Sequence, residues 1–257
     1  MKVINVNLGK ELKELRIIPI SDVHLGDKLT NYKLLKEVLQ IIKDTPNVYT
    51  ILNGDLCNTA LKNSKSDVYV DEMSPMEQIN YLIDLLEPIK HKILVIGTGN
   101  HEQRIAKETN IDVIQLVARQ LGIEDRYTNG WWYLYLRFGE KQHGRKAPMC
   151  YQLTGYHGSG GGRKPGGKVN RLEEMSQTVI ADVYIMGHTH KPMSTKSSIY
   201  LPDYANNTLT KKQMHYVMTN SFLDYGGYGE ALGFTPTDNT PVEVVLDGTK
   251  RKVKSII

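Results

Sequence analysis

Five short segments that carry Asp, Asn or His side chains constrain the fold of this chain more than any other sequence feature. Each comes where an apolar run gives way to a loop. Open α/β sheets carry their chemistry in loops at the carboxyl ends of strands. We therefore expect one site built from Asp22-Val23-His24, Gly54-Asp55, Gly99-Asn100-His101-Glu102, Tyr156-His157-Gly158 and Gly187-His188-Thr189-His190.

The order of the expected elements indicates the fold class. Apolar runs predict strands at 16–22, 48–52, 93–96 and 183–186, and Pro19 favours an edge or a locally irregular position for the first. Helical spacing and capping residues predict helices at 31–45, 75–87, 111–121 and 170–178. Strands at 131–136 and 150–154 are expected to pair, and strands dominate from residue 193 onward. This order predicts an α/β fold, a two-sheet β-sandwich flanked by helices.

The composition bounds the number of domains and the compartment. With 257 residues and 40% hydrophobic content, the chain can bury a full core, so we expect a single domain over residues 1–257. No run approaches the roughly 20 apolar residues of a membrane span, and the first residues lack a signal-peptide layout. The two cysteines suit a reducing compartment. We therefore expect a cytoplasmic protein without a membrane partner.

Two of the segments repeat one spacing. Asp22 and His24 are separated by a single residue, and so are His188 and His190. If the preceding strands continue through these residues, the two side chains of each pair point to one face. This spacing is suitable for two ligands on one metal ion.

The remaining segments supply further metal ligands. Asp55 has two carboxylate oxygens with which to bridge two cations, while Asn100 and His157 offer a carbonyl oxygen and an imidazole. A mixed nitrogen and oxygen set without thiolate suits Mn, with Fe, Zn, Ni or Co as alternatives. Two divalent ions about 3.5–4 Å apart would favour phosphoester hydrolysis by a metal-bridging hydroxide. His101 then remains to donate a proton to the leaving oxygen, with Glu102 orienting it.

The ordered series DxH, GD, GNHE, a single His and GHTH over residues 22–190 resembles the calcineurin-like metallophosphoesterase superfamily. This superfamily includes SbcD-like nucleases, cyclic-nucleotide phosphodiesterases and purple acid phosphatases, and the compact chain resembles its small microbial or phage-type members. The resemblance implies a two-sheet sandwich with one ion held by Asp22, His24 and His190, a second held by Asn100, His157 and His188, Asp55 bridging them and His101 catalytic. The Arg-Gly pair of the protein phosphatases is missing after Asp55, which argues against that activity.

Several cationic and aromatic residues are candidates for substrate contacts. Arg104 is suited to pair with a substrate phosphate or, alternatively, with Glu102 or Glu108. The glycine-rich stretch 158–167 carries Arg163 and Lys164, which would meet substrate phosphates if this stretch were a mobile lid and would otherwise belong to a solvated turn. Tyr225 and Tyr228 lie on a second glycine-rich stretch and are candidates for stacking on bases.

These observations leave three functions to compare. The favoured one is a phosphodiesterase or nuclease that acts on a nucleic acid or nucleotide diester, because His101 is present to protonate an alkoxide leaving group. A phosphomonoesterase of the nucleotidase kind would use the same ligands. A non-catalytic scaffold with this fold would be expected to lose His101 or several ligands, and all are present. The oligomeric state and the role of residues 191–257 stay open.

Overall fold

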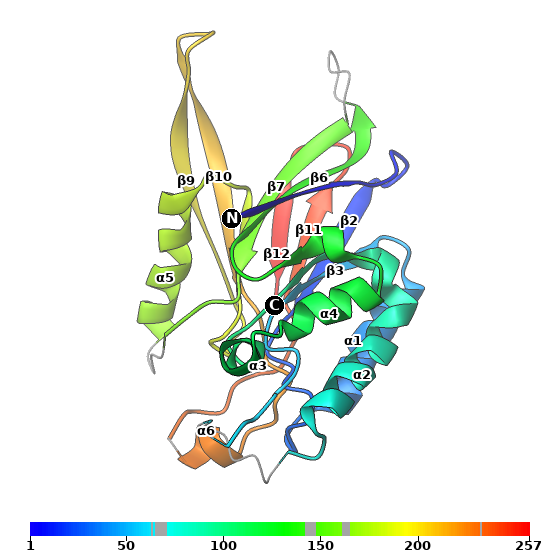
Figure 1. Ribbon diagram of the computed structural model, residues 1–257. Coiled ribbons are helices and arrows are strands. Elements are labelled where there is room, and N and C mark those ends of the chain that lie inside the picture. The colour runs from blue at the N-terminus through cyan, green and yellow to red at the C-terminus, as the bar shows by residue number, and fades with distance from the viewer. Residues whose placement is uncertain (63, 65–70, 142–147, 161–164, 232) are drawn as a thin grey trace.

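Two six-stranded sheets form the centre of the protein (Figure 1). The computed structural model describes residues 1–62, 64, 71–141, 148–160, 165–231 and 233–257. In spatial order the first sheet contains β1 (Lys2–Asn7), β6 (Trp132–Lys141), β7 (Pro148–Tyr156), β8 (Val183–Met186), β10 (Thr208–Met218) and β9 (Met193–Asp203). The second contains β12 (Val253–Ile256), β11 (Glu243–Asp247), β2 (Glu14–Ile20), β3 (Val48–Asn53), β4 (Ile93–Gly97) and β5 (Tyr127–Thr128). The expected two-sheet α/β architecture is confirmed.

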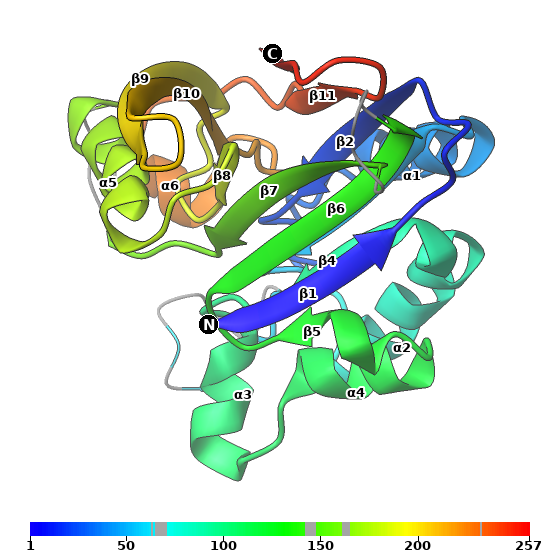
Figure 2. The ribbon, with the colours of Figure 1, turned by 90° about the horizontal axis from the view of Figure 1, so that it is seen from above.

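Helices flank this pair of sheets (Figure 2). They are α1 (Tyr32–Asp44), α2 (Pro75–Leu86), α3 (Glu102–Thr109), α4 (Val113–Gln120), α5 (Pro165–Thr178) and α6 (Gly227–Ala231), with short 3₁₀ helices η2 (Glu87–Lys92) and η3 (Glu124–Arg126). Among the described residues, no helix combines the length and apolar character that crossing a membrane requires.

The apolar residues form three clusters that correspond to the layers. Between the sheets, Ile51 and Val95 of the second sheet pack with residues of the first sheet such as Trp132. On the outer face of the second sheet, α1, α2 and α4 bury a further cluster, and on the outer face of the first sheet α5 buries a third that includes Tyr184. Strands β3, β4 and β8 are thus covered on both faces, which explains why nearly all of their residues are buried.

Two predicted helix starts are confirmed by their capping hydrogen bonds. The side chain of Asn31 accepts from the backbone N–H of Leu34 at 2.9 Å, which begins α1. Ser74 and Glu77 form a reciprocal capping box at the start of α2, with Pro75 in the first turn. These local bonds satisfy backbone donors that have no partner inside the helix.

Other expectations are corrected by the structure. Pro19 does not mark an edge strand, because β2 lies between β11 and β3. The ladder between β2 and β11 covers only Glu14–Ile17, so Pro19 lies beyond its end and removes no donor from it. Helix α3 was not expected because its polar sequence lacks an apolar period, and α6 begins within a stretch expected to be a loop.

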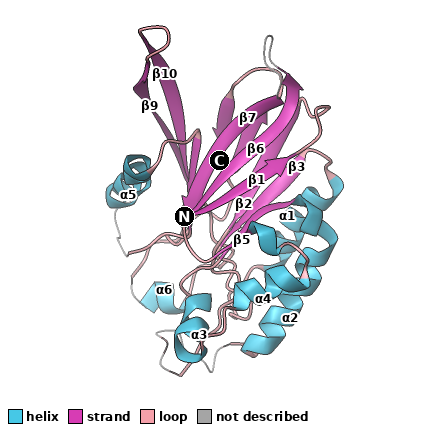
Figure 3. Ribbon diagram, turned by 45° about the horizontal axis from the view of Figure 1, so that its top comes forward, coloured by secondary structure: helices cyan, strands magenta, loops and turns pink. Residues whose placement is uncertain are grey.

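The strand directions bring the five predicted segments to one end of the molecule. Strands β2, β3 and β4 are neighbours and run parallel, and β7 runs parallel to β8. Their carboxyl ends therefore open into loops on the same side, next to α3 and α6 (Figure 3).

Candidate metal centre

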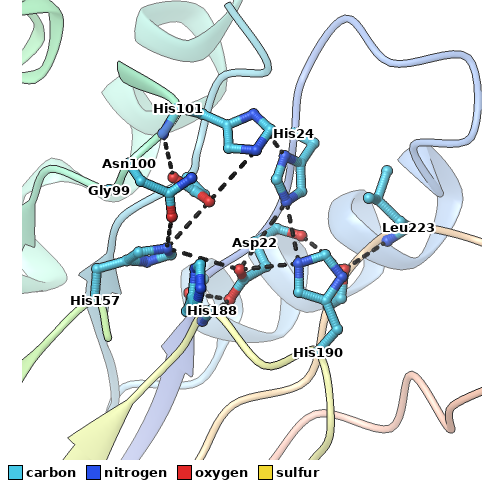
Figure 4. A network of polar contacts seen from close by, with 12 residues as sticks. Asp22, His24, Gly99, Asn100, His101, His157, His188, His190 and Leu223 are labelled. Carbon is cyan, nitrogen blue, oxygen red and sulfur yellow. Dashed lines mark hydrogen bonds and ion pairs between the residues drawn. The ribbon is translucent and has the colours of Figure 1, made fainter. Parts of the chain in front are cut away.

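Loops that follow β2, β3, β4, β7 and β8 bring the predicted ligand side chains together (Figure 4). In the described part of the chain, three groups place one ligand atom per residue within 4.8 Å of one another: Asp22 with His24 and His190, His24 with Asp55 and His101, and Asp55 with His157 and His188. Asn100 joins the last group, since its Oδ1 lies 3.1 Å from His157 Nε2. All seven residues expected as ligands are therefore gathered at one place.

Asp22 is fully buried and faces two histidines. Its Oδ1 lies 3.1 Å from His190 Nε2 and 4.0 Å from His24 Nε2, and these two ring nitrogens are 3.3 Å apart. Its Oδ2 accepts hydrogen bonds from the Ser21 hydroxyl and, at 2.9 Å, from the backbone N–H of His188. These bonds orient the carboxylate so that Oδ1 points toward the two rings.

Asp55 lies between this first group and the others. Its Oδ2 is 3.1 Å from His157 Nε2 and 3.8 Å from His101 Nε2, while Oδ1 accepts the backbone N–H of His101 at 2.8 Å. His157 Nε2 is also 4.0 Å from Asp22 Oδ1, so the groups adjoin. A carboxylate with ring nitrogens on two sides has the position that a bridging ligand would need.

A carboxylate oxygen of Asp22 and a ring nitrogen of His157 face the other ligands of the site. Asp22 Oδ1 accepts no hydrogen bond from a described residue, although His190 Nε2 is 3.1 Å away. His157 Nδ1 lies 2.9 Å from the carbonyl oxygen of Asn53, which leaves Nε2 facing Asp55 and Asn100. A second ring nitrogen held by a backbone carbonyl is a common feature of histidine ligands. The donor set therefore fits divalent cations.

The pKa values in the site show how strongly it requires positive charge. Burial lowers the pKa of His157, but the Asp55 carboxylate outweighs it and, together with Asp22, raises that pKa to about 10. Burial opposes ionisation of Asp55, yet His157 and His101 hold its pKa well below the usual range. Burial likewise opposes ionisation of Asp22, and His190 keeps its pKa low. Two buried ionised carboxylates need either a protonated imidazole or bound cations.

The ligand loops have an unusual backbone conformation. Positive φ angles between 51° and 65° occur at Asp22, His24, Asp55, His188 and His190. Each such residue costs on the order of 1–3 kcal/mol and persists only where the surrounding structure enforces it. Five of these in one site indicate that the fold stores strain to aim the side chains inward.

These φ angles also correct the expected spacing argument. Strand β2 ends at Ile20 and β8 at Met186, so neither strand continues through the ligands. In particular, His188 and His190 do not share a face: His188 joins Asp55, while His190 joins Asp22. The family resemblance also implied separate ions for these two histidines, and that assignment stays a prediction.

Gly99 allows the loops after β3 and β4 to approach closely. A Cβ at this position would lie 2.1 Å from Asp55 Oδ1 and 2.2 Å from Asp55 N. Backbone atoms at that distance cannot move aside easily. The glycine of the GNHE segment is therefore required by the position of Asp55.

Glu102 has a role that differs from the expected one. Its fully buried carboxylate accepts four backbone hydrogen bonds, from Asp55, Leu56 and Cys57 at 3.1, 2.5 and 2.9 Å and from Gly99 at 2.9 Å. The carboxylate thus joins two ligand loops instead of orienting the His101 ring. Burial, followed by the Asp55 charge, raises the pKa of Glu102 to about 7.

His101 contacts both the ligand groups and a cation. Its Nδ1 lies 3.0 Å from the Asn58 carbonyl oxygen and 3.3 Å from His24 Nδ1, while Arg104 Nη2 donates to its Nε2 at 2.9 Å. Burial lowers the pKa of His101, and Arg104 adds to this effect while Asp55 opposes it. The ring is therefore neutral in this arrangement, with its proton on Nδ1.

Two further predicted substrate contacts, Arg163 and Lys164, lie outside the described residues.

A supporting segment after β10 was not predicted from the sequence. Ser221 Oγ and the backbone N–H of Phe222 both donate to the Asp22 carbonyl oxygen at 3.0 Å. The signal was present as the polar run Thr219–Ser221 after an apolar strand, the same pattern that marked the ligand loops.

Comparison with known proteins identifies a family for this chain. A family model described as calcineurin-like phosphoesterase matches residues 15–192, a range that contains all five segments. A search of curated proteins finds no match.

Three solved structures illustrate what this chain is similar to. Vacuolar protein sorting 29 from Cryptosporidium parvum is 14% identical with a TM-score of 0.45, over 95% of this chain and 97% of that chain. A metallophosphoesterase from Sphaerobacter thermophilus is 15% identical with a TM-score of 0.44, over 94% of this chain and 87% of that chain. The calcineurin-like phosphoesterase YfkN from Bacillus subtilis is 13% identical with a TM-score of 0.38, over 94% of this chain and 90% of that chain.

Proposed function

The chain belongs to the calcineurin-like phosphoesterase family, and we propose that this metal-dependent phosphoesterase is a phosphodiesterase acting on a nucleic acid or nucleotide diester. The observation that carries the proposal is the position of His101, whose Nε2 lies 3.8 Å from the carboxylate proposed to bridge the ions. Hydrolysis of a nucleotide diester releases one of its two sugar oxygens as an alkoxide, a poor leaving group that departs more easily when it receives a proton.

The proposed ligands divide into two sets. One ion would be held by Asp22, His24 and His190 and the other by Asn100, His157 and His188, with Asp55 shared between them. When bound, two divalent ions would supply charge that offsets the phosphate and lowers the pKa of a water molecule at the site. Manganese is the first ion to test, because the set mixes imidazole with oxygen ligands and has no thiolate.

The protein's own contribution to the chemistry comes from His101 and Arg104. Arg104 Nη2 donates to His101 Nε2 at 2.9 Å. An incoming phosphate would compete for the guanidinium, since charge-assisted bonds to phosphate are stronger than a bond to a neutral ring. Nε2 would then be free to take a proton from a water molecule and to pass it to the leaving oxygen as the bond to phosphorus breaks.

Turnover of two model substrates tests the proposal. Protein stripped of metal and reloaded with Mn²⁺ is expected to hydrolyse bis(p-nitrophenyl) phosphate in preference to p-nitrophenyl phosphate, measured as the ratio of kcat/KM values. Chelator-treated protein without added metal is the control and should be inactive.

Two results would overturn this proposal. Preference for the monoester would identify a phosphomonoesterase of the nucleotidase kind. Inactivity on both esters with two ions bound would identify a non-catalytic scaffold.

A further inference from the structure

Part of the metal centre is exposed to solvent. The side chain of His190 is 35% exposed, whereas those of Asp22, His24, Asp55 and His157 are buried. His190 therefore lies on a side of the centre that a substrate can reach. The residues that surround this histidine are candidates for contacting the part of the substrate that extends beyond the phosphate.

The chain between Ser221 and Asn239, called the excursion below, begins and ends beside the ligand Asp22. It leaves β10 through Ser221, which donates to the Asp22 carbonyl oxygen, and runs through Leu223 (Figure 4). Asn239 closes the excursion, because its Nδ2 donates to the Leu223 carbonyl oxygen at 3.0 Å and its own carbonyl accepts from Asn220 Nδ2 at 3.1 Å. Loops whose ends are pinned together in this way are frequently functional.

Two further contacts hold this excursion against the ligand loops. Lys191, the residue after His190, donates from Nζ to Thr235 Oγ1 at 3.0 Å. On the other side, Asp224 N donates to the Leu29 carbonyl oxygen at 2.9 Å, and the Leu29 side chain packs against Gly226. The excursion is thus tied both to the loop that carries His24 and to the loop that carries His190.

Two aromatic rings on this excursion are exposed. Tyr225 is 49% exposed and Phe234 is 37% exposed, and the Tyr225 hydroxyl donates to the Phe234 carbonyl oxygen at 2.9 Å. Phe234 precedes Thr235, the contact of Lys191, so both rings lie within a few residues of the tethers. The bond to a backbone carbonyl oxygen holds the Tyr225 ring, and both rings add exposed apolar surface to the segment that is tethered to Lys191.

We propose that Tyr225 and Phe234 form a stacking surface for the nucleobase of the substrate, next to the partly exposed ligand His190. The inference rests on the proposed phosphodiesterase function and narrows its substrate to diesters that carry a base. Stacking on an aromatic side chain contributes about 1–3 kcal/mol per base and tolerates any base, because every base has a π face. The surface therefore selects nucleotides without selecting a sequence.

A matched pair of substrates tests this proposal. The p-nitrophenyl ester of thymidine 5′-phosphate and methyl p-nitrophenyl phosphate release the same leaving group and differ in the presence of the nucleoside. Tyr225→Ala and Phe234→Ala are each expected to raise KM for the thymidine ester roughly 5- to 150-fold, the range that 1–3 kcal/mol of stacking corresponds to. Neither variant should change kcat for the thymidine ester. Neither should change kcat or KM for the methyl ester.

Two control variants separate stacking from other effects. Tyr225→Phe keeps the ring and loses only the bond to the Phe234 carbonyl oxygen, so it should retain most of the affinity. Tyr204→Ala removes an 85% exposed tyrosine from the turn between β9 and β10 and should have no effect. Equal changes for both esters, or no change for the thymidine ester, would overturn the inference.

A binding measurement keeps this test independent of catalysis. Calorimetric titration of the Mn²⁺-loaded protein with thymidine 5′-phosphate and with methyl phosphate should show tighter binding of the nucleotide, and Tyr225→Ala should abolish the difference. If neither ester is turned over while this difference is present, the phosphodiesterase proposal fails and the stacking surface stands. If both esters are turned over and the difference is absent, only the stacking surface fails.

Discussion

Replacing His101 with alanine is expected to reduce turnover of a dinucleotide roughly 10²- to 10⁴-fold, the usual contribution of a general acid or base, while both ions remain bound. The loss should be smaller for a p-nitrophenyl diester, because p-nitrophenolate leaves without a proton. The measurement is kcat for both substrates on Mn²⁺-loaded protein, with metal content determined on the same samples.

The histidine has a competing role that this variant distinguishes. Together with His24 and Asp55, His101 forms one of the groups that could hold a metal ion. If His101→Ala lost an ion, or if both substrates slowed equally, His101 would be a ligand and not a proton donor. His91→Ala, which removes a histidine from the exposed surface, is the matched control and should leave both constants unchanged.

Replacing Glu102 with alanine is expected to lower the free energy of unfolding by about 3–5 kcal/mol, because buried backbone donors would lose their charged acceptor. Four N–H groups on two ligand loops depend on this one carboxylate. Since small proteins have only about 5–15 kcal/mol of stability, the effect should be large in urea unfolding. Metal affinity should fall with it, because Asp55 and Gly99 would no longer be held together.

A conservative variant tests the cause of that loss. Glu102→Gln keeps the shape and one acceptor oxygen, so it should destabilise the protein less than alanine does. If glutamine and alanine were equally harmless, the four hydrogen bonds would not be the connection between the two loops. If alanine destabilised the protein but left metal affinity unchanged, Glu102 would serve folding alone.

The sequence predicted the parts of the structure that depend on local chemistry. Asn31 and Ser74 begin helices because their side chains satisfy nearby backbone donors, and that requirement is visible in a few adjacent residues. The convergence of the five segments was also predictable, since parallel strands present their carboxyl ends together. The ordered motifs identified the family from the same segments.

What the sequence did not reveal depends on long-range geometry. The positive φ angles at Asp22 and His190 are enforced by neighbouring loops, so a rule based on continuing strands assigned His188 to the wrong neighbour. Glu102 was expected beside His101 because they are adjacent in sequence, whereas the structure turns its carboxylate toward backbone groups more than 40 residues away. Ser221 supports Asp22 from 199 positions away, and the polar run that marks this segment in the sequence does not indicate which residue it contacts.

Metal binding is the most direct test of the central claim that these loops form a dinuclear centre. Metal-stripped protein is titrated with Mn²⁺, and the number of bound ions and their affinities are compared with those of Asp55→Asn and of Asp84→Asn, a change on the exposed face of α2. The account predicts two ions per chain for the unmodified protein and for Asp84→Asn, and weaker binding of both ions together in Asp55→Asn. Binding of a single ion, or retention of both with unchanged affinity in Asp55→Asn, would contradict it.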